Sequence, residues 1–298
     1  MNINIKFLAV KSLLIAAVAL FIFPSCNDDI LDEKPLDFLS PDNAYLTEAG
    51  ALQGITAIHD RVRSAYYSFG EFGVMNWATH GSDLGYNGET PGPGGSYLNS
   101  YADMTPVWRN VIATWNVGFE IIQWANVLID RVESADPDVF AEGEAGKNKY
   151  IAEARFFRAF AYRYLVSTYG DIPLLTEPIN SAKADFIRNP VADIHNLMVE
   201  DFQYAANNLP KPGEEDAPGR ITQGPAWHYL AETYLEQDNF EKAVEAATRV
   251  IEDYDYDLMT SRFGTKLGND VFGSGDVFLD LFGFGNHNLP ENKESMWV

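Results

Sequence analysis

The stretch from residue 68 to residue 106 contains the side chains best suited to chemistry. Four large aromatic residues alternate there with acids and amides: Trp77, Asp83, Tyr86, Asn87, Tyr97, Asn99 and Tyr101. A sugar presents a flat C–H face to an aromatic ring, while its hydroxyls bond carboxylates and amides. We therefore expect Trp77, Asp83, Tyr86, Asn87, Tyr97 and Tyr101 to contact a glycan. The alternative is that the rings only anchor this segment on the rest of the protein.

The same stretch is rich in glycine and proline, which predicts a long irregular insertion. Long insertions of this kind in compact domains are usually functional or disordered, and the aromatic residues argue against disorder. Its segment from Pro91 to Gly95 resembles a phosphate-binding loop. It lacks the Gly-Lys-Ser/Thr ending that holds a phosphate, so we expect no phosphate site.

Signals for catalysis or metal binding are weak. The histidines His59, His80, His195, His228 and His287 are scattered and lack the paired spacing of a zinc site. No G-x-S-x-G nucleophile elbow occurs. Carboxylate pairs for glycoside hydrolysis are always available among 43 acids, but nothing singles one out. The sequence thus predicts no metal site and no catalytic residue. The hypothesis that the protein is a surface glycosidase therefore has little support.

The N-terminus has the pattern of a secretory signal. Lys6 and Lys11 precede the apolar run 13–23, which is short for a membrane span, and Pro24-Ser25-Cys26 follows. A cysteine after a small residue resembles a bacterial lipobox, which predicts cleavage before Cys26 and lipidation of its sulfur. Phe23 and Pro24 depart from the commonest lipobox residues, and an ordinary signal followed by a chance cysteine is the alternative. The segment Asn27-Asp28-Asp29 that follows resembles an acidic surface-export tag.

Composition narrows the class of partner. The formal net charge is −22, from 43 acids and 21 bases. Such a charge repels nucleic acids and anionic membrane surfaces, so neither is expected as a partner. Hydrophobic residues make up 46% of the chain, as expected for a folded protein.

Apolar residues recur every three or four positions over most of the chain, which indicates helices. We expect helices over residues 40–67, 107–132, 149–169 and 190–209. The helix over 149–169 is apolar or aromatic around most of its circumference, which is typical of a helix buried among others. Gly170 and Pro173 predict its end.

The most regular local pattern begins at Ala226. Residues at offsets of 3, 4, 7, 13, 16, 20 and 23 from Trp227 are small or apolar. This is the spacing of a tetratricopeptide helix pair, in which small residues allow two antiparallel helices to approach closely. Asp238 stands where a glycine often occupies the turn. One such unit cannot bury its own face, so we expect it to stack on the helices over 149–169 and 190–209.

After Asp257 the helical spacing of apolar residues is lost, and residues 292–298 are predicted to begin a β-strand. A folded domain seldom stops inside an apolar strand, so the sequence suggests a shortened version of a longer protein. We therefore expect an all-α fold with three parts: a signal over 1–25, a surface tether over 26–39, and a helical domain over 40–298 that is truncated at its C-terminus.

Four stretches resemble the SusD/RagB family of nutrient-binding outer-membrane lipoproteins. They are EARFFRAFAYRYLVSTYGDIPLLTEP, VADIHNLMVEDFQYAANNLP, GRITQGPAWHYLAETYLEQDNFEKAVEAATRVIE and the lipobox with its acidic tail. The helix from Trp108 to Asn126 is also similar to one in this family. The resemblance covers nearly the whole mature chain but only the family's N-terminal half.

The resemblance implies a tetratricopeptide-like helical fold with a loop-rich insertion. It implies a surface lipoprotein that captures a glycan or another oligomeric nutrient and caps a SusC-like TonB-dependent β-barrel transporter, with ligand contacts in the aromatic segment. It implies no catalysis and no cofactor. The alternative is an envelope scaffold or truncated relic that uses its helices only for protein contacts.

Overall fold

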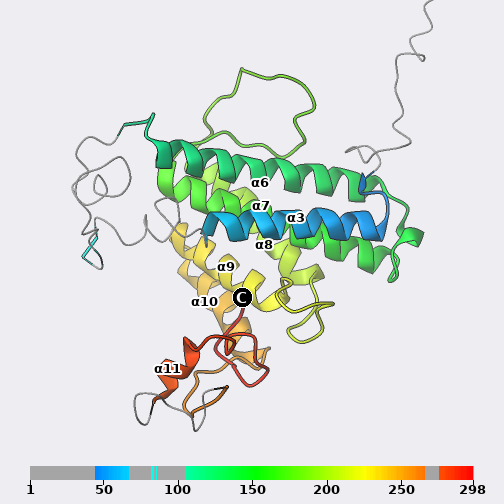
Figure 1. The fold of residues 1–298 in the computed structure, drawn as a ribbon. Coiled ribbons are helices and arrows are strands. Elements are labelled where there is room, and N and C mark those ends of the chain that lie inside the picture. Colours follow the sequence, from blue (N-terminus) through cyan, green and yellow to red (C-terminus); the bar gives the residue numbers. More distant parts are fainter. Residues whose placement is uncertain (1–43, 67–81, 84, 86–104, 266–274, 298) are drawn as a thin grey trace, which may run out of the picture. The chain divides into compact units, whose positions relative to one another are not determined.

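The computed structural model describes residues 44–66, 82–83, 85, 105–265 and 275–297. Within these residues the regular structure is helical, as predicted. The helices are α3 (Glu48–Tyr66), α6 (Arg109–Ser134), α7 (Glu144–Tyr169), α8 (Val191–Asn208), α9 (Gln223–Glu236), α10 (Phe240–Glu252), α11 (Val277–Leu281) and the 3₁₀ turn η2 (Pro137–Val139). Figure 1 shows α3, α6, α7 and α8 running alongside one another.

The expected start of the first helix at Ser40 lies outside the described residues. Residues 45–47 are not helical, and α3 begins at Glu48. The hydroxyl of Thr47 accepts a hydrogen bond from the Gly50 N–H at 3.2 Å. A side-chain oxygen in that position satisfies an amide that has no partner inside the helix, so Thr47 marks the helix start.

Helix α7 is the centre of the described fold. It packs against α3, α6 and α8 and buries aromatic residues on several sides, including Phe156, Phe157 and Tyr162. The helix ends at Gly170, whose φ of 69° suits glycine and whose N–H bonds the Val166 carbonyl. Both the buried central helix and its glycine cap were predicted from the sequence.

Helices α7, α8, α9 and α10 pack each against the next along the chain. Helices α9 and α10 pack closely, and Leu230 and Ala231 of α9 and Ala243 and Ala246 of α10 are all buried. Asp238 in the turn between them has a φ of 57°, a conformation that favours glycine. The tetratricopeptide-like pair and its strained turn therefore agree with the sequence pattern.

Helix α10 also carries an apolar stripe that faces away from α9. Phe240, Val244 and Ile251 are 62–70% exposed, although they follow helical spacing. In a helical repeat this outer face normally receives the next helix. Among the described residues no helix covers it.

A buried arginine ties three helices to the loop over residues 170–190. Arg158 of α7 donates to both carboxylate oxygens of Asp201 in α8, at 2.7 and 2.8 Å. Its remaining nitrogen donates to Asn126 of α6 and to the Thr176 carbonyl. Asn126 in turn donates to the carbonyls of Leu175 and Glu177. These bonds explain why polar residues interrupt an otherwise apolar helix.

The expected β-strand over residues 292–298 is wrong for residues 292–297, which form turns and irregular chain. A strand requires a neighbouring strand for its backbone bonds, and the described residues supply none. The short helix α11, which the sequence analysis missed, lies nearby. The buried Asp280 at its end holds Arg262 and accepts the Phe263 N–H at 3.1 Å.

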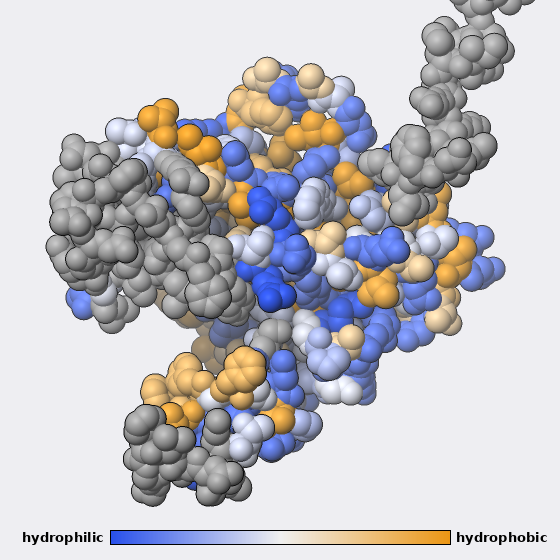
Figure 2. All heavy atoms as spheres, viewed as in Figure 1, coloured by the Kyte–Doolittle hydropathy of each residue, from blue (hydrophilic) through white to orange (hydrophobic). Residues whose placement is uncertain are grey.

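Exposed apolar side chains gather at α11. Phe278, Leu279, Phe282 and Phe284 are 53–94% exposed, and Figure 2 shows an apolar group over this part of the chain. Among the described helices, none is both long and apolar enough to cross a membrane.

Candidate functional site

Most of the predicted site lies outside the described residues. This applies to Cys26, Trp77, Tyr86, Asn87, Tyr97 and Tyr101, and to the signal and tether over residues 1–39. Asp83 is described and is exposed at a bend. The structure therefore places one of the six expected ligand contacts on the surface and does not test whether the six come together.

The two helices that flank the aromatic segment are joined by a side-chain contact. Arg61, near the end of α3, donates to Glu120 of α6 at 2.8 Å. The segment leaves α3 after Tyr66 and re-enters the described chain at Thr105, whose carbonyl accepts the Trp108 N–H. Its ends are thus held on neighbouring helices of one folded core.

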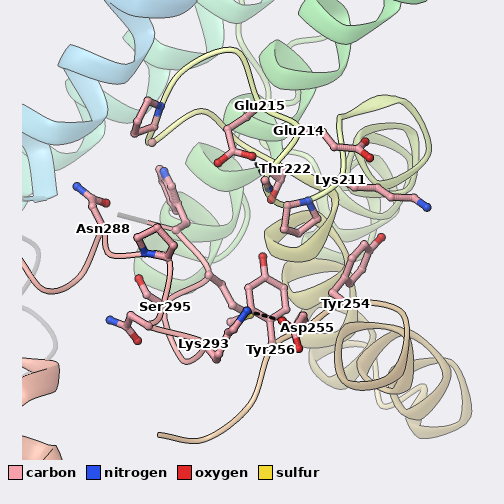
Figure 3. A pocket seen from close by; sticks show the side chains of 18 of the residues that line it. Lys211, Glu214, Glu215, Thr222, Tyr254, Asp255, Tyr256, Asn288, Lys293 and Ser295 are labelled. Atoms are coloured by element: carbon pink, nitrogen blue, oxygen red, sulfur yellow. Dashed lines mark hydrogen bonds and ion pairs between the residues drawn. The ribbon is translucent and has the colours of Figure 1, made fainter. Parts of the chain in front are cut away.

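A cavity of about 610 Å³ lies elsewhere, where three segments meet. Its walls come from the loop over residues 211–222, the chain after α10 at residues 253–256, and the final segment over residues 287–297. Figure 3 shows Glu215 and Thr222 on one side, Tyr254 and Tyr256 on a second, and Asn288 and Ser295 on a third. The volume falls in the range of sites for small molecules.

The first wall is fixed by a buried ion pair. Arg220 donates to both carboxylate oxygens of Glu153 in α7, at 3.0 and 2.8 Å, and Glu153 is 1% exposed. The same carboxylate bonds His59 of α3 at 2.8 Å and accepts the Ile221 N–H. One acid of the central helix therefore positions both α3 and the loop that borders the cavity.

The second wall carries two tyrosines on a rigid support. The Tyr254 hydroxyl bonds Gln223 at 2.8 Å, and Gln223 donates to the Leu209 carbonyl. The Tyr256 ring lies so close to Gly224 that an added Cβ would meet it at 2.5 Å. The hydroxyl of Tyr256 bonds Thr222. Both rings are therefore held by the first turn of α9.

Burial raises the pKa of the Tyr254 and Tyr256 hydroxyls above 10. Both phenols are therefore protonated at neutral pH and can donate hydrogen bonds. Lys293 and Asp255 form an ion pair across the cavity wall.

An aromatic cluster backs the third wall. Trp297 contacts the rings of Phe156, Phe157 and Phe160, with centroid separations of 5.5–6.1 Å. These are edge-to-face contacts, an arrangement that aromatic quadrupoles favour. The final segment is thereby attached to the central helix, so the third wall of the cavity is built on the protein core.

The structure gives no sign of a metal centre at this cavity in the part of the chain that it describes. In the described part of the chain, no three histidine, cysteine or acidic side chains come together to hold a metal ion. The cavity offers rings, hydroxyls and amides together with acidic and basic side chains. The sequence analysis missed this site because its walls come from segments about 30 residues or more apart. The alternating acids and tyrosines at 253–257 were the one local signal in the sequence.

Comparison with known proteins supports the family that the sequence motifs suggested. Residues 95–235 match a family model described as "Starch-binding associating with outer membrane", named SusD-like. A SusD-like protein of Bacteroides ovatus is 27% identical over 311 residues, which cover 98% of this chain and 50% of that protein. The chain spans about half the length of the curated relatives that it matches.

Two solved structures share the fold. One is named a laminarin-binding SusD-like protein, with a TM-score of 0.65 and 24% identity over 72% of this chain and 47% of that chain. The other is a crystal structure with a xylogluco-oligosaccharide, with a TM-score of 0.61 and 24% identity over 83% of this chain and 45% of that chain. The helical fold, the family model and the curated relatives together support the assignment of this chain to the SusD-like family.

Proposed function

We propose that this protein is a cell-surface lipoprotein that binds a glycan or another oligomeric nutrient and delivers it to a SusC-like TonB-dependent transporter in the outer membrane. The similarity to the SusD-like family over residues 95–235 is the observation that carries the proposal. The laminarin and the xylogluco-oligosaccharide named for two proteins of similar fold support a glycan as the first ligand class to test.

The aromatic segment between α3 and α6 is the proposed capture site. Trp77, Tyr86, Tyr97 and Tyr101 would stack on sugar rings, and Asp83 and Asn87 would bond hydroxyls. Two packed helices hold the ends of the segment, which supports a site built on a rigid scaffold.

A binding assay tests the capture site directly. The purified chain beginning at Asn27 is titrated with laminarin and xyloglucan oligosaccharides by calorimetry. Replacing both Trp77 and Tyr86 by alanine should weaken binding by about tenfold or more, since stacked rings dominate such interfaces. Trp124→Ala, which alters a partly exposed tryptophan on α6, is the matched control and should leave the affinity unchanged. Equal affinities for all three proteins would contradict the assignment.

Anchoring and delivery need separate tests. Labelling cells with a lipid precursor should mark the wild-type protein and leave Cys26→Ala unlabelled. Affinity purification from the outer membrane should recover a TonB-dependent barrel with the wild-type protein. Absence of the barrel from repeated purifications would argue against delivery, even if glycan binding were intact.

A second candidate function is an envelope scaffold that uses its helices for protein contacts. The observation that favours it is the exposed apolar stripe of Phe240, Val244 and Ile251 on α10. Replacing the residues of this stripe by polar ones should change which proteins a scaffold binds. Because a scaffold would bind no glycan, the Trp77 and Tyr86 variants should then behave like the wild-type protein.

A further inference from the structure

We infer that the cavity between residues 211–222, 253–256 and 287–297 is a second carbohydrate site, which takes a short neutral oligosaccharide. The inference rests on the proposed function, because it assumes that the protein binds glycans. It concerns a different part of the chain from the aromatic segment between α3 and α6.

Ring surfaces and hydroxyl partners converge in this cavity. Tyr254, Tyr256 and Trp297 line it, and the two tyrosine rings are 6.1 Å apart at 60° to one another. Both tyrosines are partly exposed, so their rings can pack on the C–H faces of sugars. Asn288 and Ser295 lie on the opposite side of the cavity from Tyr254, and the structure pairs neither side chain with another described residue. They are therefore available to bond sugar hydroxyls.

The charges on the walls favour a neutral ligand. Of the described residues that line the cavity, Glu214, Glu215, Asp253 and Asp255 are acidic, against Lys211, Arg220 and Lys293. Arg220 is bound to Glu153, Lys293 to Asp255 and Asp253 to Arg249, so these four lining residues are already paired. Glu214 and Glu215 remain against Lys211. A uronic or sulfated sugar would therefore meet more negative than available positive charge.

The supporting residues hold the rings in place before any ligand arrives. Gln223 fixes Tyr254, the absence of a side chain at Gly224 makes room for Tyr256, and the Phe156 cluster holds Trp297. Side chains ordered in advance lose little entropy when a ligand binds, which raises affinity. This separates the cavity from an incidental gap between loops.

Calorimetry with neutral tetrasaccharides tests the inference. The probes are maltotetraose, cellotetraose, laminaritetraose and mannotetraose, with trigalacturonic acid as the acidic comparison. Ser295→Trp should fill the cavity and weaken binding of the preferred probe at this site by about tenfold or more. Asn288→Ala, on an exposed side chain, should weaken it by a smaller factor without adding bulk. Ser181→Trp, at an exposed position outside the cavity, is the matched control.

The outcomes separate this inference from the proposed function. If the cavity variants lose one binding event and the Trp77 and Tyr86 variants lose another, both sites exist. If the Trp77 and Tyr86 variants abolish all binding while Ser295→Trp and Asn288→Ala bind like wild type, the second site is refuted and the proposed function stands. If the wild-type protein binds none of the neutral probes, laminarin or xyloglucan, both fail. Tighter binding of trigalacturonic acid than of every neutral probe would refute the neutral class.

Discussion

Two acidic side chains are almost fully buried in the helical core, and an arginine from another element neutralises each. Asp201 of α8 is paired with Arg158, and Glu153 of α7 with Arg220. Burying a carboxylate is costly unless it is paired and hydrogen-bonded. Each acid here accepts at least three hydrogen bonds or charge contacts, which offset part of this cost where helices and loops must be joined.

The Asp201 pair should be much more important for stability than the exposed pairs. Asp201→Asn removes the partner of a buried guanidinium and should cost about 3–5 kcal/mol of unfolding free energy. Glu232→Gln, in the half-exposed pair with Arg163 at 3.0 Å, should cost about 1 kcal/mol or less. Urea unfolding followed by circular dichroism measures both. Similar losses for the two variants would show that the buried pair contributes no more than a surface pair.

Glu153 should give the protein a pH-dependent stability. Burial alone would raise the pKa of its carboxyl, but the hydrogen bond from His59 and the charge of Arg220 outweigh burial and hold the pKa below 4.5. The stabilisation is therefore present above the ordinary pKa and is lost as the pH falls through the lowered folded-state value. We expect Glu153→Gln to flatten the fall in unfolding free energy below pH 4.5.

Urea unfolding at a series of acidic pH values measures this effect. Glu252→Gln, at an exposed position at the end of α10, is the control and should retain the wild-type slope. At neutral pH, Glu153→Gln should also be less stable by about 3–5 kcal/mol, since two basic side chains lose their buried partner. If the unfolding free energy of Glu153→Gln fell with pH as steeply as that of the wild-type protein, Glu153 would not be the source of the pH dependence.

At the scale of elements, the close approach of α6 and α7 depends on a glycine. A Cβ added at Gly118 would lie 2.6 Å from Leu165 Cγ, and Leu165 is completely buried. Gly118→Ala should therefore push the helices apart and lower stability by about 1–3 kcal/mol, although alanine favours helix formation. Asn116→Ala, at an exposed position two residues earlier on the same helix, should change stability by about 0.5 kcal/mol or less.

Thermal or urea unfolding of the two variants would decide the point. A stabilised Gly118→Ala protein would mean that helix propensity outweighs packing at this position.

The elements that could be predicted from sequence are those with a local physical signature. The aromatic periodicity of α7, the Gly170 cap and the unusual turn at Asp238 are local, and the structure bears out all three. The break in the expected helix at residues 45–47 was missed because Thr47, a capping residue inside an apolar pattern, was not weighed. Helix α11 and the irregular course of residues 292–297 depend on Asp280 and Asn286, which act through contacts with distant residues.

At the scale of the whole molecule, the candidate site was harder to predict than the fold. The aromatic segment could be recognised by its composition. The cavity walls, by contrast, come together through the ion pair of Arg220 with Glu153 and the ring contact of Trp297 with Phe156. No local pattern in the sequence predicts contacts between residues so far apart in the chain. Sequence alone therefore indicated which residues suit a sugar, while the fold was needed to bring separate segments together.

The net charge of −22 should decide which glycans this protein accepts. A neutral oligosaccharide feels no net force from this field, so its affinity should be the same at low and high salt. An acidic oligosaccharide is repelled, and salt screens that repulsion because the Debye length falls to about 10 Å near 0.1 M and about 3 Å near 1 M. We therefore expect weak binding of trigalacturonic acid at low salt and stronger binding as sodium chloride is added.

Calorimetry at several salt concentrations tests this expectation with the neutral and acidic probes in parallel. The opposite trend, an acidic probe that binds more weakly as salt rises, would reveal a local basic site that overrides the molecular charge. The two cations already paired on the cavity wall argue against such a site there, since Arg220 and Lys293 each hold a carboxylate. The sign of the salt dependence therefore reports whether the long-range field or local pairing governs ligand choice.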